Sequence, residues 1–367
     1  MSLSTKLQAC FKGFTSWIDT HNFYKKSFYK KNGALKRWLA LFFTSFLCCI
    51  LVCSLVLTVI ANVYLGKIDR EVIDSHEVDV PDTAIDVYGN QDIINIMLFG
   101  IDSRDMSEIS RSDSIMLITV DKKHTKIKMT SIARDTRVPI EGYGEDKLNH
   151  AFAYGWNKTG EIVDGAKLAL KTINNAFNLN VTSYVTANFW ALAKIIDYLG
   201  GVDIDVDEQE RAVINKNYIP YMQNIGVECE PIATTGMQHL SGGQAVAYCR
   251  VRYVGGDVMR GERQREVLMA MYEDVKTLNP LKYPELISLV LDECSTSLSN
   301  AQLLSLGTWA LSNMGSLKFE TLGIPTSDLD YGGYVDGVWY YLYDTDVAAK
   351  KIENFILETS EENSVSK

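Results

Sequence analysis

The sequence lacks the motifs on which the common hydrolase classes depend. Only five of its 367 residues are histidine, and it contains no HExxH, no GxSxG and no pair of CxxC motifs. HExxH supplies zinc ligands to metalloproteases, and GxSxG presents the nucleophile of many serine hydrolases. The sequence therefore argues against a zinc hydrolase or a serine hydrolase of the usual kind.

Charged residues are absent from one long stretch near the N-terminus. Residues 38–66, WLALFFTSFLCCILVCSLVLTVIANVYLG, contain no charged side chain in 29 positions, and a spanning helix needs about 20 apolar residues. Eight lysines or arginines and one acid, Asp19, precede them. The positive-inside rule thus predicts a basic cytoplasmic segment at 1–37 and a transmembrane helix at 38–66. A cleaved signal peptide is the alternative, but the run is too long, starts too late and lacks a small-x-small site that is followed by a polar mature start.

This topology predicts a single-pass membrane protein whose folded part lies outside the cytoplasm. Beyond residue 66 basic residues are in the minority, since 28 basic and 45 acidic side chains give a formal charge of about -17. Such a surface repels polyanions, so we expect no nucleic acid partner. A cluster of arginines in this acidic part must therefore be arranged for a particular ligand.

Cysteine is scarce in the same part of the chain. Cys229, Cys249 and Cys294 are the only three cysteines after residue 66. An odd number allows at most one disulfide and leaves one free thiol. A Cys229–Cys249 bridge is compatible with the sequence, which does not decide between it and free thiols.

The composition divides the chain after residue 66 into three segments. Residues 67–90 are acidic, weakly periodic and contain Pro81, which predicts an extracytoplasmic stalk. We expect the folded domain at 91–358 and a polar tail at 359–367. Apolar β-rich runs predict strands at 93–101, 114–121, 126–132, 184–189, 202–206 and 317–322. Helical patterns occur at 161–178, 190–199, 242–249, 260–277, 285–291, 300–313 and 345–357, which indicates an α/β or α+β domain with helices covering a sheet.

Aspartate and arginine stand at the ends of the predicted core strands. Asp102 and Arg104 come just after the first strand, and Arg111 and Asp113 come just before the second. If these strands run antiparallel, all four side chains lie at one edge of the sheet. Arg134 follows the buried third strand and, with Asp135 beside it, requires a carboxylate or a bidentate anion as partner.

Two carboxylates near several arginines suit a divalent cation that holds a diphosphate. Carboxylate oxygens are ligands for a hard metal, and guanidinium groups bind the remaining phosphate oxygens. The alternative is that Asp102–Arg104 and Asp113–Arg111 are surface ion pairs that close a loop. Three such clusters at the ends of three core strands favour the diphosphate site.

The densest arginine cluster is RVRYVGGDVMRGERQRE at 250–266, in which five of 17 residues are arginine. After the predicted helix at 242–249, an extended chain would point Arg250 and Arg252 to one face. Val251 and Tyr253 would then point to the other face. The first part of the cluster is therefore expected to present two guanidiniums together.

The second part of the cluster is predicted to be a helix with Asp257 as its N-cap. Helical spacing places four residues on one stripe, namely Arg260, Arg263, Gln264 and Val267. Arg265 falls off this stripe and is expected to be solvated and dispensable. The alternative is an ordinary charged helix, which explains Arg265 well but leaves Arg250 and Arg252 unexplained.

An ordered set of segments resembles the LytR–CpsA–Psr family of bacterial cell-envelope phosphotransferases. The segments are IMLFGIDSR, RSDSIMLITV, KIKMTSIARDTRV, KLNHAFAYG, YVTANFWALAKIIDYLGGVDIDV, MQHLSGGQAVAYCRVRY and GDVMRGERQREVL, which together span about 93–277. Ala133 departs from the proline usual in the family, and His150 is a second departure. Neither change removes a charged group.

The resemblance implies an α/β domain with a central mixed sheet between helices and an apolar channel for a polyprenyl chain. It implies transfer of a glycan phosphate from a polyprenyl-diphosphate carrier to peptidoglycan, with magnesium, or manganese in its place. Asp102 and Asp113 would hold the metal. The diphosphate would be bound by Arg104, Arg134, Arg250, Arg252, Arg260 and Gln264, with Arg111, Lys147 and Arg263 as weaker candidates. Arg134, Arg252 and Asp257 are the expected catalytic residues, and Asp257 either holds arginines or serves as the base.

Two other functions are compatible with parts of the sequence. A polyprenyl-diphosphate pyrophosphatase or a non-catalytic lipid-carrier binding module would use the same charged residues. A membrane-bound transcriptional regulator would need a DNA-binding part on the cytoplasmic side, and residues 1–37 show no helix-turn-helix. The motifs identify neither the glycan nor the oligomeric state.

Overall fold

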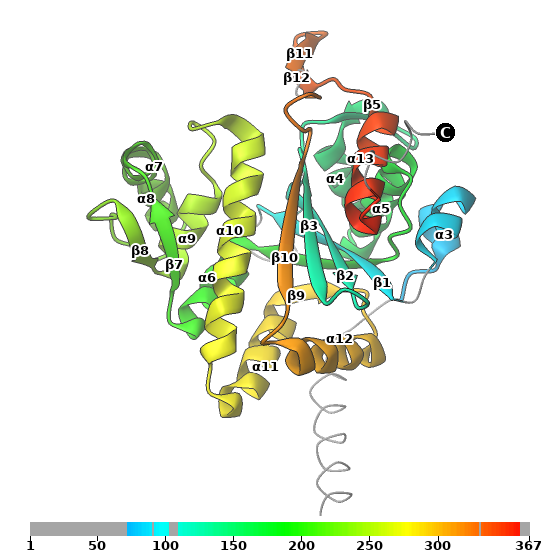
Figure 1. The fold of residues 1–367 in the computed structure, drawn as a ribbon. Helices are drawn as coiled ribbons and strands as arrows, with labels where there is room; N and C mark the ends of the chain where they lie inside the picture. The colour runs from blue at the N-terminus through cyan, green and yellow to red at the C-terminus, as the bar shows by residue number, and fades with distance from the viewer. Residues whose placement is uncertain (1–71, 90–91, 103–108, 330–331, 360–367) are drawn as a thin grey trace, which may run out of the picture. The chain divides into compact units, whose positions relative to one another are not determined.

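A computed structural model describes residues 72–89, 92–102, 109–329 and 332–359, and Figure 1 shows their arrangement. The chain divides into two units, residues 1–66 and 67–367, and all described residues belong to the second. Among them no helix is long and apolar enough to cross a bilayer. The predicted anchor at 38–66, the basic segment before it and nearly all of the polar tail lie outside the described residues.

Six strands form one mixed sheet at the centre of the domain, in the order β10-β3-β2-β1-β6-β9. Their bounds are β1 Ile93–Ile101, β2 Ser112–Asp121, β3 Lys126–Ile132, β6 Ser183–Asn188, β9 Cys294–Thr296 and β10 Lys318–Ile324. β1 and β3 run antiparallel to β2, whereas β6 is parallel to β1 and β10 is parallel to β3. The α/β fold with a mixed sheet is thereby confirmed, and the first two strands are antiparallel as the site prediction required.

Three helices cover one face of this sheet, α4 (Leu148–Thr159), α5 (Ile162–Phe177) and α13 (Thr345–Leu357). Alternate side chains of the central strands, including Phe99 and Leu117, are buried against them in one apolar core. Gly155 lets α4 and α5 approach closely, because a Cβ there would lie 2.3 Å from the carbonyl oxygen of Asp164. The sequence predicted α5 and α13 but missed α4.

A second helical layer lies on the other side of the sheet in Figure 1. It contains α6 (Phe189–Leu199), α9 (Gly242–Cys249) and α10 (Gly256–Thr277), with the ribbon of β7 (Val202–Val206) and β8 (Gly236–Leu240). Their apolar side chains form a second core, in which Ile196, Val246 and Val267 are fully buried. The arginine-rich stretch 250–266 therefore joins two helices of this layer.

Shorter elements complete the described domain. Two hairpins rise from it, β4 (Arg137–Ile140) with β5 (Gly144–Lys147) and β11 (Gly332–Val335) with β12 (Val338–Tyr341). The remaining elements are η1 Ser75–Val78, α3 Asp82–Tyr88, α7 Glu208–Val213, η2 Ile214–Tyr218, α8 Ile219–Asn224, η3 Pro280–Lys282, α11 Tyr283–Glu293 and α12 Asn300–Asn313. The β4–β5 hairpin leads directly into α4, which begins at the edge of the charged site.

The prediction of a stalk at 67–90 is wrong for its described part. Residues 72–89 form η1 and α3, and their side chains Val78, Ala84 and Tyr88 are buried in the first core. Asn174 of α5 also donates from Nδ2 to the carbonyl of Val78 at 3.1 Å. The apolar residues of this segment are interspersed with acids at irregular intervals, so the sequence pattern underestimated how much of the segment is buried.

Candidate active site

The ends of three strands bring the predicted charged residues to one edge of the sheet. In the antiparallel pairs, Gly100 near the end of β1 lies opposite Ser114, and Met116 of β2 lies opposite Ser131 near the end of β3. The β1–β2 register then shifts, because Ile101 pairs with Ser112. Asp113 is the extra residue of this bulge, and bulges redirect side chains in this way.

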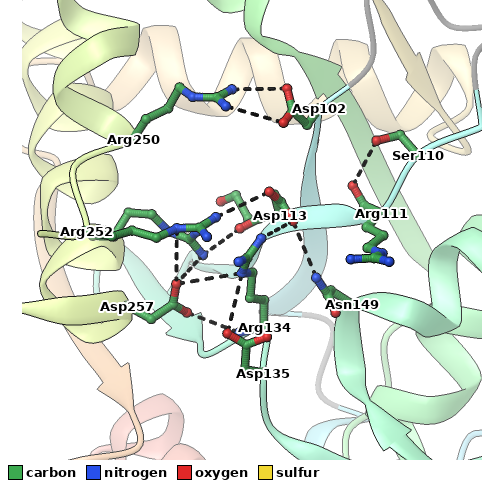
Figure 2. Close-up of polar contacts among 12 residues, drawn as sticks. Asp102, Ser110, Arg111, Asp113, Arg134, Asp135, Asn149, Arg250, Arg252 and Asp257 are labelled. Atoms are coloured by element: carbon green, nitrogen blue, oxygen red, sulfur yellow. Dashed lines mark hydrogen bonds and ion pairs between the residues drawn. The ribbon is translucent and has the colours of Figure 1, made fainter. Parts of the chain in front are cut away.

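Asp113 is the centre of the charged cluster in Figure 2. Arg134 Nη1 bonds its Oδ1, and Arg252 Nη2 lies 3.3 Å from its Oδ2. Arg260 Nη2 donates to the backbone carbonyl of the same residue at 2.7 Å. Burial acts to raise the pKa of Asp113, but the three guanidiniums outweigh it and hold the pKa below its ordinary value. Asp113 is therefore a charged carboxylate at neutral pH.

Asp102 and Arg250 form the second part of the cluster. Arg250 donates from Nη1 to Oδ1 at 3.0 Å and from Nη2 to Oδ2 at 3.3 Å. Its guanidinium carbon also lies 4.2 Å from the ring centroid of Phe189 and 4.5 Å from that of Tyr221. Two rings and one carboxylate thus fix the position of this cation.

Asp257 is not the N-cap that the sequence predicted. α10 begins at Gly256, and its N-cap is Gly255, whose φ of 76° favours glycine. The carboxylate of Asp257 instead faces the arginines, with Oδ1 2.6 Å from Arg260 Nη2 and 3.9 Å from both Arg134 Nε and Arg252 Nε. Burial lowers the pKa of Arg260 to about 10 despite Asp257, so Arg260 stays charged at neutral pH.

A cavity of about 340 Å³ opens between these groups. Six predicted site residues line it, namely Asp102, Asp113, Arg250, Arg252, Arg260 and Gln264. Phe189, Tyr218, Cys249 and Tyr253 complete the lining. Gln264 is oriented by Ser114, whose Oγ donates to its Oε1 at 2.7 Å. The structure therefore brings both predicted metal ligands and three predicted phosphate-binding arginines to one cavity.

The comparisons with known proteins agree with this geometry. A model of the LytR_cpsA_psr family matches residues 60–355. The chain belongs to this family. It is 30% identical over 265 residues to the polyisoprenyl-teichoic acid–peptidoglycan teichoic acid transferase TagU of Oceanobacillus iheyensis, covering 70% of this chain and 73% of the relative. It is 32% identical over 239 residues to TagU of Enterococcus faecalis, covering 64% and 71%.

Solved structures of the LytR_cpsA_psr family share the fold. TagT bound to LI-WTA superposes with a TM-score of 0.57 at 27% identity, over 73% of this chain and 90% of that one. YwtF (TagT) with bound octaprenyl pyrophosphate lipid gives a TM-score of 0.55 at 26% identity, over 80% and 99%. The family predicted from the ordered sequence segments is confirmed.

The weaker candidates of this LytR_cpsA_psr protein lie around the cavity or outside it. Lys147 Nζ lies 2.9 Å from Asp135 Oδ1, and Asp135 Oδ2 lies 3.7 Å from Arg134 Nε. Arg111 is exposed and stands on the far side of Asp113 from Arg252 in Figure 2. Arg104 lies outside the described residues. Within the part of the chain that the structure describes, Lys147 is thus joined to the cluster through Asp135.

Arg263 does not face the cavity, which corrects the predicted helix stripe. Its Nε lies 2.7 Å from Glu210 Oε1 of α7, and its Nη1 donates to the carbonyl of Val251 at 3.2 Å. Both side chains of the ion pair are almost completely buried. The prediction assumed that only one face of the helix is covered. In the structure, α7 and α9 also cover the face of α10 that carries Arg263.

Arg265 is also placed differently from the prediction that it is solvated. It is 5% exposed, and its Nη1 bonds Ser131 Oγ of β3. Burial lowers its pKa, and Glu262 and Glu266 counteract this only in part. Tyr253 likewise lines the cavity instead of pointing away with Val251, because residues 250–255 turn after α9 and do not form a straight strand.

Sequence reasoning missed Asn149 at the start of α4. Its side chain is 2% exposed, its Nδ2 lies 3.4 Å from Asp113 Oδ1, and its Oδ1 has no hydrogen-bond partner within the described part of the chain. Because α4 was not predicted, no periodicity marked this residue. The segment KLNHAFAYG that contains it was recognised only through the family resemblance.

The three cysteines whose disulfide pairing the sequence did not decide are free thiols. Cys229, Cys249 and Cys294 form no disulfide in the described part of the chain. Cys249 lines the cavity, and burial raises the pKa of its thiol to about 12. It is therefore a neutral wall residue and not a nucleophile.

A second acidic group lies at the opposite end of β2. Oxygen or nitrogen atoms of Asp121, His124 and Glu358 come within 4.8 Å of one another. The fully buried Lys128 Nζ lies 3.3 Å from Asp121 Oδ2 and 3.0 Å from Glu358 Oε1. Lys126 Nζ lies 2.6 Å from the same Glu358 oxygen, so two ammonium groups balance the two carboxylates, and the cluster fastens the C-terminal end of α13 to β3.

Proposed function

We propose that this protein transfers a glycan phosphate from a polyprenyl-diphosphate carrier to peptidoglycan. The observation that supports this most is the single cavity lined by Asp102, Asp113 and three arginines. Its relatives are named as teichoic acid transferases, and one solved relative holds octaprenyl pyrophosphate. Phe189, Tyr218 and Tyr253 give the cavity an aromatic part, which suits the prenyl end of a carrier.

The charge balance of the cluster also favours a diphosphate bound with a cation. Five cations (Arg134, Lys147, Arg250, Arg252 and Arg260) meet four carboxylates (Asp102, Asp113, Asp135 and Asp257). Among the described residues one net positive charge remains, less than the two to three negative charges of a diphosphate. These described side chains alone therefore do not neutralise the substrate, and a divalent cation would supply the deficit.

Asp102 and Asp113 fit such a cation, which we propose to be Mg²⁺ or Mn²⁺. Both carboxylates line the cavity and offer only oxygen ligands, which hard divalent ions prefer. Both are now held by guanidiniums, which could turn to the phosphate oxygens once a metal occupies the carboxylates. When bound, the metal would neutralise phosphate charge and polarise the phosphorus–oxygen bonds.

The side chains of the cavity would bind and orient the reacting groups. An acceptor hydroxyl oxygen forms a bond to the glycan-linked phosphorus, and the bond from that phosphorus to the bridging oxygen breaks. Polyprenyl phosphate leaves and takes up the proton of the hydroxyl group. Arg134, Arg252 and Arg260 converge on Asp113, where they can stabilise charge on the equatorial oxygens. Asp257 contacts the same three guanidiniums, so we assign it to holding them and not to accepting the hydroxyl proton.

The membrane topology completes the proposal. We propose that residues 38–66 anchor the protein, with residues 1–37 in the cytoplasm and the catalytic domain outside. The uncharged 29-residue run and the basic residues before it support this orientation. A polyprenyl carrier lies in the same bilayer, so anchoring keeps the cavity near its substrate.

A transfer assay with the full-length protein tests this function. We expect glycan phosphate to move from a polyprenyl-diphosphate donor to peptidoglycan with wild-type protein, and at least 100-fold more slowly with Arg252→Ala. Arg252 is 38% exposed, so its loss should leave the fold intact. Release of glycan phosphate to water at the same rate without an acceptor would identify a pyrophosphatase. Donor binding without either reaction would identify a lipid-carrier binding module.

A further inference from the structure

A second, larger cleft lies at the far end of α4 from the cavity. It encloses about 610 Å³, and its walls come from η1, the turn of the β4–β5 hairpin, the end of α4 and the first half of α5. Tyr143 and Lys158 are among its lining residues. No part of the proposed phosphoryl transfer uses this cleft.

Helix α4 connects the cleft to the phosphate-binding cavity. Asn149 near its start lies 3.4 Å from Asp113, and Lys158 in its last turn lines the cleft. Nine residues separate them, which is about 14 Å along a helix. His150, Tyr154 and Lys158 follow at intervals of four residues and share one face of α4, which is partly open to solvent. This face of α4 lies between the end of the helix that contacts Asp113 and the end that lines the cleft.

The middle of that surface is an aromatic platform. Tyr143 stacks on Tyr154 with ring centroids 4.2 Å apart and planes 7° from parallel, and Tyr143 is 45% exposed. Asp146 fixes the platform, because its Oδ2 accepts from Tyr154 Oη at 2.5 Å and lies 2.8 Å from His150 Nδ1. Open ring faces flanked by polar groups suit the apolar faces and hydroxyls of sugars.

The charges of the cleft are mixed. Three lysines (Lys158, Lys167 and Lys171) and three acids (Glu77, Glu141 and Asp164) line it. Lys167 is paired with Glu77 at 2.6 Å and Lys171 with Glu141 at 2.5 Å, whereas Lys158 makes no ion pair within the described part of the chain. A polyanionic glycan would meet three carboxylates there. A peptide that carries both carboxylates and ammonium groups could place a carboxylate on Lys158 and an ammonium group beside the acids.

We propose that the open face of α4 and this cleft bind the acceptor. The sugar rings of peptidoglycan lie over Tyr143 and Tyr154, and the peptide stem enters the cleft beside Lys158. The acceptor hydroxyl then reaches the cavity near Asn149, whose Oδ1 lacks a hydrogen-bond partner in the described structure. This inference rests on the proposed transferase function and names the surface that its second substrate uses.

Two substitutions on this surface test the inference in full-length protein. Soluble, uncrosslinked peptidoglycan strands serve as the probe in calorimetric titration and as the acceptor in the transfer assay. Lys158→Glu and Tyr143→Ala should each weaken strand binding and raise the acceptor KM at least tenfold, with an unchanged donor KM. Tyr143→Phe, which keeps the ring, should restore binding. Lys123→Glu makes the same charge change at an exposed turn on the opposite end of β2 and should bind normally.

The outcomes separate this inference from the proposed function. Wild-type binding and transfer in both test variants overturn the inference but leave the transferase function intact. A raised donor KM with a normal acceptor KM assigns the surface to the donor glycan and also overturns it. If the wild-type protein binds strands through Tyr143 and Lys158 but transfers nothing, the proposed reaction fails and the acceptor surface stands.

Discussion

Arg250 donates to both carboxylate oxygens of Asp102 through a forked contact, at 3.0 and 3.3 Å. Arg250 belongs to the second helical layer, and Asp102 directly follows strand β1 of the sheet. The pair joins the end of β1 to the loop after α9, which lie 148 residues apart in sequence. The rings of Phe189 and Tyr221, both within 4.5 Å of the guanidinium carbon, restrict the group further. Arg250 is therefore positioned before any substrate arrives.

Arg250→Lys is the substitution that tests this preorganisation. Lysine keeps the charge but cannot make the forked contact or stack as a plane on the rings. We expect kcat/KM for the donor to fall at least tenfold while the unfolding temperature changes little. Arg211→Lys is the matched control, since Arg211 makes a similar forked contact with Glu208 on the surface. Equal activity of the two variants would contradict the assigned role of Arg250.

The charge of Asp113 should make stability depend on pH. Asp113→Asn removes the carboxylate that Arg134 and Arg252 contact, at a cost of roughly 3 kcal/mol, the low end for a broken buried pair. Since the folded pKa of Asp113 lies below its ordinary value, its contribution is complete above about pH 4 and disappears as pH falls through the lowered pKa. Urea unfolding at several pH values should show a constant difference in the free energy of unfolding between wild type and variant from pH 8 to 5. This difference should become smaller below about pH 4.

Much of this site could be predicted because strand ends are easy to locate. The runs at 93–101 and 126–132 match β1 and β3 residue for residue, and their order fixed where Asp102 and Arg134 would lie. The bulge at Asp113 could not be predicted, because it depends on a register shift between two strands. It nevertheless decides which way this carboxylate points.

Two of the errors, at Arg263 and Arg265, arise because helix α10 is covered on more than one side. Period-3.6 spacing shows which residues of α10 share a face, but it does not show which neighbour that face meets. Arg263 meets Glu210, which is distant in sequence and sits on a short helix that was not predicted, and Arg265 meets Ser131. Arg263 was predicted to face the ligand and Arg265 to be solvated, whereas both side chains are buried.

The Arg263–Glu210 pair should affect stability and not catalysis. Arg263→Ala leaves the buried Glu210 uncompensated, so we expect a loss of about 3–5 kcal/mol in the free energy of unfolding. The double variant Arg263→Met with Glu210→Leu removes both charges and should recover most of it. Activity per folded molecule should stay near the wild-type value in the double variant. A specific loss of donor binding in that variant would return Arg263 to the phosphate site.

Arg265 should be replaceable by an apolar side chain of similar length. Its guanidinium is buried, and its Nε has no hydrogen-bond partner among the described residues. Arg265→Met removes a poorly compensated charge while filling the same space, so the unfolding temperature should equal or exceed that of wild type. Arg265→Ala leaves a cavity and should cost about 2–5 kcal/mol. If alanine is tolerated as well as methionine, the side chain is not packed as described.

Metal binding should require the diphosphate as well as the two carboxylates. Without a diphosphate, Arg250 and Arg134 compete for Asp102 and Asp113, so Mg²⁺ alone should bind weakly. With a short-chain prenyl diphosphate the arginines gain phosphate partners and release the carboxylates. We therefore expect the unfolding temperature to rise by several degrees only when both are present, since a ligand at 100 times its Kd adds about 2.7 kcal/mol.

Asp102→Asn tests the contribution of the metal separately from that of the diphosphate, by the same measurement of the unfolding temperature. The variant keeps a polar side chain beside Arg250 but loses the negative charge that a divalent ion needs. The joint stabilisation should disappear, whereas Asp205→Asn, at an exposed position of β7, should retain it. Full stabilisation of wild type by the diphosphate in the presence of a chelator would show that the arginines neutralise the substrate without a metal. The one net positive charge of the cluster makes that result unexpected.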